Sequence, residues 1–291
     1  MTDRIPAQHV TLFEMAPRDG LQNEKRLIPT AHKIALIDRL SACGFAHVEA
    51  TSFVSPKWVP QLADAGEVMD GITRRPGTRY TVLTPNLKGY ERARAARADG
   101  IAIFASASEG FSKANLNATI ADSLDRFAAV ADAARGDGIS VRGYVSVVTD
   151  CPYDGPVAPG AVARVAERLF AMGCHEVSLG DTIGHATPET TDAMLSAVLG
   201  IAEVERLAGH FHDTTGRALE NIGVSLERGL RTFDSCVGGL GGCPYAPGAK
   251  GNVATEAVIP FVEARGFATG VDRAAVEAAA GFAKGLIASA D

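Results

Sequence analysis

Two histidines on either side of one phenylalanine are the first candidates for chemistry in this sequence. His210 and His212 flank Phe211 in an apolar run with the composition of a β-strand. Because side chains alternate across a strand, both imidazoles point to one side and Phe211 to the other. Two imidazoles placed this way can share one divalent ion. They can equally be core histidines satisfied by hydrogen bonds, and the spacing alone leaves both interpretations open.

Oxygen ligands for such an ion are available elsewhere in the chain. Asp19 closely follows an apolar run, in the segment Pro17-Arg18-Asp19-Gly20, and Asn252 ends a glycine-rich stretch. Nitrogen and oxygen ligands without a thiolate suit Mg²⁺ or Mn²⁺, and also Zn²⁺ or Co²⁺. Arg18 can hold a carboxylate or a thioester oxygen with two hydrogen bonds. By itself, an Arg-Asp pair is also typical of a surface ion pair or a turn.

Two further carboxylates belong to other strand-like runs. Glu49 lies within residues 47–53, and Asp181 ends residues 176–181. Carboxylates near a metal ion and an arginine stay ionised, and they can orient a substrate or move protons. A structural role is the alternative for each of them.

The stretch 237–252 contains six glycines and two prolines, and we predict that it forms a mobile flap over an active site. Cys243 at its centre is a candidate acid or nucleophile, or a bystander. Lys250 and Lys25 are candidate contacts for a phosphate or carboxylate, although most exposed lysines bind nothing specific. The other four cysteines are predicted to be buried small hydrophobes: Cys43, Cys151, Cys174 and Cys236.

Eight short apolar runs must position these residues. Their starts are roughly 22 to 40 residues apart, which matches a strand followed by a crossover helix. The runs are residues 10–15, 47–53, 79–84, 101–106, 141–148, 176–181, 207–212 and 232–237.

The segments between these runs have helical spacing. Thr30 is predicted to cap one helix, Thr187 another, and residues 117–135 and 216–229 two more. Eight strand–helix pairs predict an α/β fold, a (β/α)₈ TIM barrel, with an extra C-terminal helix at 271–287. We expect one domain over residues 1–291. An open doubly wound sheet is the alternative, but the early glycine fingerprint of that fold is missing.

Composition limits the function classes. The chain has 291 residues and a net charge of −6, so a nucleic-acid partner, which would require a basic surface, is not expected. No apolar run has the length of a membrane span, and no membrane partner is expected. Five cysteines without paired spacing suit reduced thiols. With no leader apparent at the N-terminus, a cytoplasmic location is expected.

Four strings of the sequence resemble the family of 3-hydroxy-3-methylglutaryl-CoA (HMG-CoA) lyases. They are the flap residues 239–252 and the segments 17–25, 49–57 and 178–184. The resemblance runs from about residue 10 to 271, and it implies a metal-dependent (β/α)₈ barrel. The implied reaction is a retro-Claisen cleavage of HMG-CoA to acetyl-CoA and acetoacetate, as used in leucine degradation and ketone body formation.

The resemblance also implies roles for individual residues. Mg²⁺ or Mn²⁺ is expected on four ligands, Asp19, His210, His212 and Asn252, and His210 is expected to serve catalysis too. Arg18 is expected to stabilise the thioester oxygen. Lys25 remains a candidate substrate contact on its residue type alone. Glu49 and Asp181 are expected to position or move protons, and Cys243 to supply the acid or a relay to it. Glu256 matches a family acid of less certain role, and a homodimer is the expected assembly.

Some residues depart from the family pattern. They are Gly110, Thr215, Pro247 and Lys250, and they are expected to widen the acyl pocket. The nearest alternative is therefore a lyase for a longer 3-hydroxy-3-alkylglutaryl-CoA, such as the isohexenyl compound. A Claisen-type synthase of the isopropylmalate or homocitrate class is a second alternative, but Gly20 stands where those enzymes usually carry an acid. A metal-binding protein without activity on the same fold is the third.

Overall fold

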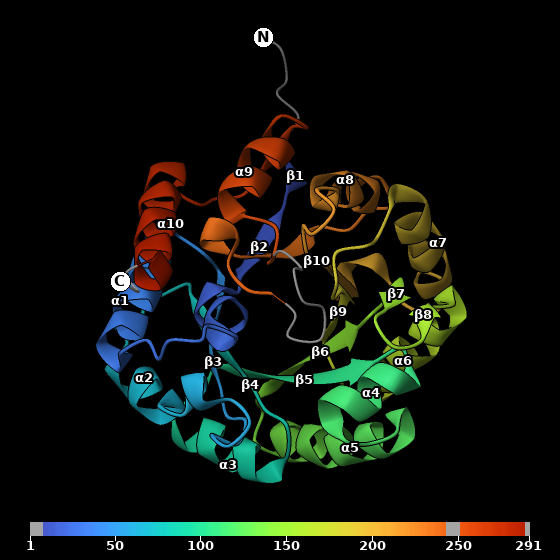
Figure 1. Ribbon diagram of the computed structural model, residues 1–291, viewed down its shortest axis with the longest axis horizontal. Helices are drawn as coiled ribbons and strands as arrows, with labels where there is room; N and C mark the ends of the chain where they lie inside the picture. Colours follow the sequence, from blue (N-terminus) through green and yellow to red (C-terminus); the bar gives the residue numbers. More distant parts are fainter. Residues whose placement is uncertain (1–7, 243–250, 289–291) are drawn as a thin grey trace.

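The computed structural model describes residues 8–242 and 251–288, and this part of the chain contains a closed barrel of eight parallel strands (Figure 1). The order around the barrel is β10-β11-β2-β3-β4-β5-β6-β9, and β9 pairs with β10 to close it. The strands are β2 (Thr11–Glu14), β3 (His47–Ser52), β4 (Arg79–Leu83), β5 (Gly100–Ser106), β6 (Ser140–Ser146), β9 (Glu176–Asp181), β10 (Leu207–Phe211) and β11 (Thr232–Ser235). Each corresponds to one predicted run, so the predicted TIM barrel is confirmed.

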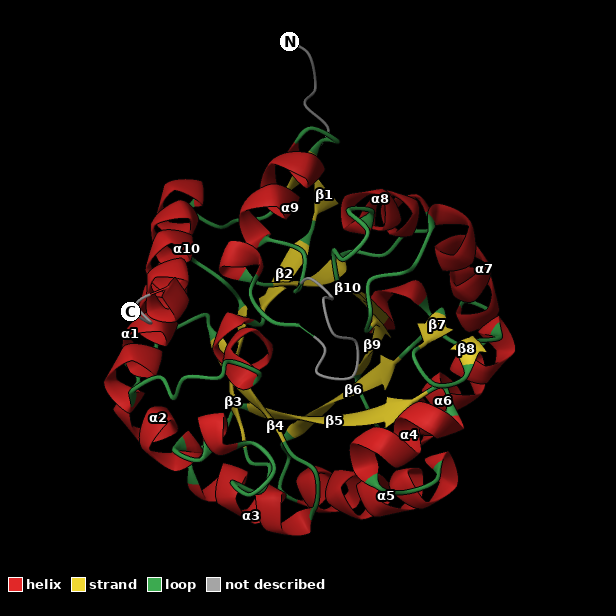
Figure 2. Cartoon of the chain, in the orientation of Figure 1, coloured by secondary structure: helices red, strands yellow, loops and turns green. Residues whose placement is uncertain are grey.

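Helices surround the strands as an outer layer (Figure 2). They are α1 (Thr30–Ala42), α2 (Ala65–Gly71), α3 (Leu87–Ala95), α4 (Glu109–Leu116), α5 (Ile120–Gly136), α6 (Pro159–Ala171), α7 (Pro188–Val198), α8 (Ala218–Glu227), α9 (Thr255–Glu263) and α10 (Arg273–Ala288). The last is the predicted extra C-terminal helix, and it packs against α1 and α9. Among the described residues, no helix combines the length and the apolar character that crossing a bilayer requires.

Short elements complete the described chain. β1 (Gln8–His9) pairs with β12 (Phe267–Ala268), and β7 (Asp150–Cys151) forms a hairpin with β8 (Gly155–Pro156). One turn of π-helix, η1 (Ala16–Gly20), follows β2 directly. The remaining turns are 3₁₀-helices: η2 (Pro60–Leu62), η3 (Val204–Arg206) and η4 (Val237–Gly239).

Two of the predicted helix starts need comment. Thr187 caps α7 as expected, and it forms a capping box with Thr190. Thr30 does not cap α1: it is the first helical residue, and its hydroxyl donates to Asp64 instead. Its position after Pro29 explains the difference, since the proline already sets the extended conformation before the helix.

The helix predicted at 117–135 also begins later than expected. Asn117 is left-handed, with φ 49°, and it ends α4. Thr119 then caps α5 by accepting from the backbone of Asp122. The predicted helix therefore corresponds to α5 with a later start, and α4, which was not predicted, precedes it across a sharp turn.

The main apolar core lies between the strands and the helices, while the inside of the barrel is largely polar. Phe211 belongs to the outer core, as strand alternation predicted for it. Inside, a small apolar cluster of Phe13, Met15 and Tyr144 lies beside buried charged groups on β3, β6 and β11. All four described cysteines are buried and free, which confirms their prediction as small hydrophobes.

Candidate active site

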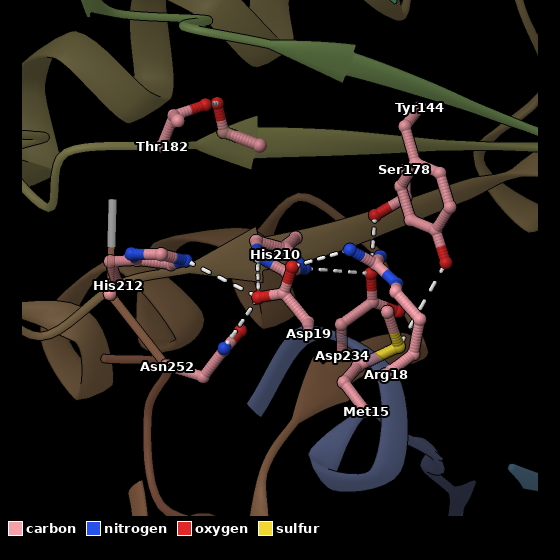
Figure 3. Close-up of polar contacts among 12 residues, drawn as sticks. Met15, Arg18, Asp19, Tyr144, Ser178, Thr182, His210, His212, Asp234 and Asn252 are labelled. Carbon is pink, nitrogen blue, oxygen red and sulfur yellow. Dashed lines mark hydrogen bonds and ion pairs between the residues drawn. The ribbon is translucent and has the colours of Figure 1, made fainter. Parts of the chain in front are cut away.

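Three potential metal ligands meet where the C-terminal ends of β2 and β10 open onto one face of the barrel (Figure 3). Asp19 comes from η1, whereas His210 lies in β10 and His212 directly follows it. One ligand atom from each residue lies within 4.8 Å of the other two. The Nε2 atoms of His210 and His212 are 3.9 and 3.8 Å from Oδ2 of Asp19. The predicted pairing of the two imidazoles with Asp19 is therefore present.

Asn252 completes this group from the far end of the glycine-rich stretch. Its Nδ2 donates to Oδ2 of Asp19 at 2.7 Å and to the carbonyl of Leu240 at 3.2 Å. A β-bridge between His212 and Asn252 fixes the backbone at this point. The Oδ1 atom of Asn252 is buried and has no hydrogen-bond partner among the described residues. A carbonyl oxygen, a carboxylate and two imidazoles fit a divalent cation.

Asp19 is held in its ionised form. Burial alone would raise the pKa of its carboxyl group, but the Arg18 guanidinium and the two imidazoles outweigh burial. Its pKa consequently lies well below the usual value. A carboxylate that keeps its charge near neutral pH is suited to binding a cation.

Arg18 joins Asp19 to a second carboxylate. Its Nη1 donates to Asp19, while its Nε and Nη2 donate to Oε2 of Glu49 at 3.0 and 2.8 Å. The hydroxyl of Tyr144 donates to the same Oε2 at 3.1 Å. Oε1 of Glu49 is buried without a partner among the described residues, and burial raises the pKa of this carboxyl despite Arg18. Glu49 therefore positions the guanidinium and keeps one oxygen free.

Asp181 has a different environment. Its two carboxylate oxygens accept from the backbone amides of His185 and Ala186, at 3.1 and 3.0 Å, and so fasten the loop before α7. Burial raises the pKa of Asp181, although these bonds and the nearby His212 act against the shift. Asp181 lies close to His212. Its carboxylate forms its hydrogen bonds with the loop, and not with the side chains of Asp19, His210 or His212.

The remaining predicted residues are less central or not described. Lys25 is exposed and does not line the cavity above the ligand cluster. Cys243 and Lys250 lie outside the described residues. Glu256 accepts from the amide of Gly238 and from Lys284, so it supports the start of the glycine-rich stretch rather than facing Asp19.

Sequence reasoning missed three buried polar residues beneath the site. Arg142 donates to Tyr144 and to both oxygens of Asp234, and Asp234 in turn contacts Nδ1 of His210. A signal existed for each: Arg142 and Tyr144 lie two residues apart in one predicted strand, and Asp234 is a charged residue inside another. In a barrel strand these positions face inward.

A cavity of about 610 Å³ opens above the ligand cluster. Arg18, Asp19, His210 and His212 lie along one part of its lining. Another part is apolar and is formed by Val54, Trp58, Val59, Leu83, Phe104 and Phe111. The cavity is thus lined both by the ligand cluster and by apolar side chains, a mixture typical of sites for small molecules.

Comparisons with known proteins show which family this chain is similar to. The HMGL-like family model matches residues 9–282. A mitochondrial hydroxymethylglutaryl-CoA lyase of Arabidopsis thaliana is 55% identical over 94% of this chain. The crystal structure of the HMG-CoA lyase from Brucella melitensis superposes with a TM-score of 0.95 at 66% identity, over 96% of this chain and 99% of that one.

The chain belongs to the hydroxymethylglutaryl-CoA lyase family. It spans 58% of the length of the Arabidopsis relative. A second bacterial member is the 3-hydroxy-3-isohexenylglutaryl-CoA/hydroxy-methylglutaryl-CoA lyase of Pseudomonas aeruginosa, which is 56% identical over 90% of this chain and 88% of its own length.

The departures from the family pattern do not widen the cavity at the two positions that are described. Neither Gly110 nor Thr215 lines it. Gly110 lies against the β7–β8 hairpin, where an added Cβ would be 2.3 Å from Oδ1 of Asp154. Thr215 donates its hydroxyl to the carbonyl of Gly184. At these positions the residues contact neighbouring loops and not the cavity, so the expected effect on pocket size is wrong for these two residues.

Proposed function

We infer that this protein is a hydroxymethylglutaryl-CoA lyase, which cleaves HMG-CoA to acetyl-CoA and acetoacetate. The observation that carries this conclusion is the convergence of Asp19, His210 and His212 within 4.8 Å at the mouth of a barrel shared with HMG-CoA lyases. The direct experiment is to supply purified protein with HMG-CoA and to quantify both products.

We propose Mg²⁺ or Mn²⁺ as the cofactor, held by Asp19, His210, His212 and Asn252. The free Oδ1 of Asn252 and the ionised carboxylate of Asp19 support this ligand set. When bound, the ion polarises the oxygens of the substrate and acidifies its 3-hydroxyl group. Replacing His210 with alanine, followed by a Mn²⁺ binding titration, tests the assignment.

Arg18 is proposed to act on the thioester end of the substrate. Cleavage of the C2–C3 bond converts the 3-hydroxyl carbon into a ketone and leaves the electron pair on the acetyl-CoA enolate. Negative charge then develops on the thioester oxygen, and a guanidinium already fixed by Glu49 stabilises it without reorganising. The same contact is weaker in the ground state, so Arg18 contributes chiefly to kcat.

Proton transfers are proposed for the remaining acids. Glu49 keeps Oε1 free, and burial raises the pKa of both Glu49 and Asp181, which brings them nearer to the range useful for exchanging protons. One of them is proposed to help remove the proton from the 3-hydroxyl group. Cys243 is proposed to protonate the enolate carbon, directly or through a relay.

A second candidate substrate is a longer 3-hydroxy-3-alkylglutaryl-CoA. The Pseudomonas relative whose name includes the isohexenyl compound is as similar to this chain as the Arabidopsis relative, and several apolar side chains line the cavity. Comparing kcat/KM for HMG-CoA and for an isohexenyl analogue separates the two. A synthase function is not favoured by the relatives, which are lyases.

Several finer statements remain predictions. They are a contact between Lys25 and the substrate, a single domain over residues 1–291, a homodimer, a cytoplasmic location and a place in leucine degradation. The position of Lys25, exposed and in the segment after η1, is compatible with the first. Analytical ultracentrifugation tests the homodimer, and Lys25→Ala with a measured KM tests the substrate contact.

A further inference from the structure

Beneath the proposed metal site lies a buried carboxylate that the mechanism above does not use. We propose that Asp234 is a positioning residue for His210: it accepts the Nδ1 proton of the imidazole and thereby presents Nε2 to the metal ion. This inference depends on the proposed function, because it assumes that His210 is a ligand.

The contacts of Asp234 fix its orientation. The side chain is fully buried, and its Oδ2 lies 3.0 Å from Nδ1 of His210. Ser178 donates its hydroxyl to the same Oδ2 at 2.7 Å, while Nη2 of Arg142 donates to Oδ1 at 2.7 Å. Because donors hold both oxygens, the carboxylate has little freedom to rotate away from the imidazole.

Hydrogen bonding decides which nitrogen of His210 carries the proton. The guanidinium of Arg142 donates to both oxygens of Asp234 and Ser178 donates to Oδ2, so Asp234 is the acceptor in each of these contacts. A carboxylate paired with a guanidinium accepts hydrogen bonds, and Nδ1 of His210 is therefore the donor. The neutral ring then has its lone pair on Nε2, the atom that faces Asp19 at 3.9 Å.

His212 has no such support. Its Nδ1 is buried without a partner among the described residues, while its Nε2 lies 3.8 Å from Oδ2 of Asp19 and a β-bridge to Asn252 holds its backbone. The two imidazoles of the site are therefore held by different means. A carboxylate behind a metal-binding histidine fixes its tautomer and ring orientation, and losing such a partner typically costs 10- to 100-fold in metal affinity.

The first test is a Mn²⁺ titration of folded protein, followed by electron paramagnetic resonance of the free ion. Asp234→Asn is expected to raise the Kd for Mn²⁺ by about 10-fold or more. Glu176→Gln is the matched control, because Glu176 pairs with Nε of the same Arg142 at 2.7 Å without contacting His210. The control is expected to leave Kd within about twofold of the wild-type value.

A double-mutant cycle separates positioning from general damage. If Asp234 acts through the imidazole, Asp234→Asn adds nothing to the Kd of the His210→Ala variant. An equal loss in both backgrounds overturns the proposal, and so does an Asp234→Asn variant that binds Mn²⁺ as the wild type does. Wild-type protein that binds no Mn²⁺ overturns the proposed metal site as well, which distinguishes the two failures.

The second test needs no variant at Asp234, so it stands if Asp234→Asn does not fold. The chain has seven histidines, and ¹⁵N-histidine labelling with long-range proton–nitrogen correlation reports the tautomer of each ring. The signal that disappears in His210→Ala identifies His210. In metal-free wild-type protein it is expected to be protonated at Nδ1. Protonation at Nε2 alone contradicts the proposal.

Discussion

Asn252 donates its Nδ2 proton to Oδ2 of Asp19 at 2.7 Å, although the two residues are 233 positions apart in the sequence. One follows β2 and the other closes the glycine-rich stretch after β11, and these two strands are neighbours in the barrel. The contact therefore ties the far end of that stretch to the proposed metal ligands. Any substitution that moves the backbone at Asn252 should therefore change the affinity for the metal ion.

Gly251 is the simplest position at which to test the link between the backbone at Asn252 and metal affinity. A Cβ there would lie 2.5 Å from the carbonyl oxygens of Gly239 and Leu240 and 2.6 Å from that of Gly241. Since all three are backbone atoms, Gly251→Ala must displace the segment that carries Asn252. We expect a Mn²⁺ Kd at least about tenfold higher, as for loss of a supporting contact at a metal site.

The matched control for this prediction is Gly281→Ala. Gly281 lies in α10, and an added Cβ would meet nothing within 4 Å. Metal affinity should be unchanged, and stability should rise by about 0.4–1 kcal/mol because the unfolded chain loses freedom. Normal Mn²⁺ binding by Gly251→Ala would show that Asn252 is not a ligand held by this geometry.

Replacing Arg18 tests the proposed stabilisation of the enolate. Arg18→Gln is expected to lower kcat by about 10²- to 10³-fold or more and to change KM much less, since the charge it offsets develops in the transition state. Steady-state kinetics on HMG-CoA measures both parameters, with circular dichroism as the folding control. A variant with near-normal kcat would remove Arg18 from the mechanism.

Glu14 predicts a pH dependence of stability. Burial raises the pKa of this carboxyl to about 7, even though the amides of Ala16 and Val237 and the hydroxyl of Thr255 act in the opposite direction. The folded state thus keeps a proton that the unfolded state releases near pH 4.5. Stability should fall as pH rises from about 4.5 to 7, by up to about 3 kcal/mol.

The measurement compares wild type with Glu14→Gln by urea unfolding across this pH range. The glutamine variant stays neutral, so its stability relative to wild type should increase with pH and level off above about pH 7. A difference that does not change with pH would mean that Glu14 titrates normally in the folded protein.

Replacing Gly110 is expected to lower the stability of the protein without changing its substrate specificity. Gly110→Ala places a Cβ against Asp154 and Tyr153, at 2.3 and 2.8 Å, so it should lower the free energy of unfolding by about 1–3 kcal/mol and with it the thermal midpoint. The ratio of kcat/KM for HMG-CoA and a longer 3-alkyl analogue should not change, because Gly110 does not line the cavity. A changed ratio would restore Gly110 as a specificity residue.

The sequence alone was sufficient for the barrel because its strands are short apolar runs separated by amphipathic helices, and each run was found within a few residues. His210, His212 and Asp19 could be paired in advance, since strand alternation and the C-terminal ends of barrel strands are general rules. Helix boundaries were harder to predict. Thr30 is a residue type that suits an N-cap, but Pro29 takes that position before α1. Asn117 was expected to begin a helix, but it adopts the left-handed conformation and ends α4.

The support beneath the site could not be derived in the same way. Asp234 contacts His210 because β11 pairs with β10 in a register that sets these two residues side by side, and it meets Arg142 of β6, which is not a neighbour of β11, across the inside of the barrel. Sequence patterns show that a residue faces inward, but they do not show which inward residue it meets. For the same reason, only the structure reveals the hydrogen bonds from Arg18 to Glu49 and those from the loop amides to Asp181.

The most direct test of the central claim is acetoacetate release from HMG-CoA by the purified protein, with added Mg²⁺ or Mn²⁺ and with EDTA. We predict turnover that EDTA abolishes and that excess Mg²⁺ or Mn²⁺ restores, with acetyl-CoA formed in equal amount. Turnover that is insensitive to EDTA would contradict the proposed metal site. No cleavage of HMG-CoA or of its longer 3-alkyl analogues under any of these conditions would contradict the lyase function itself.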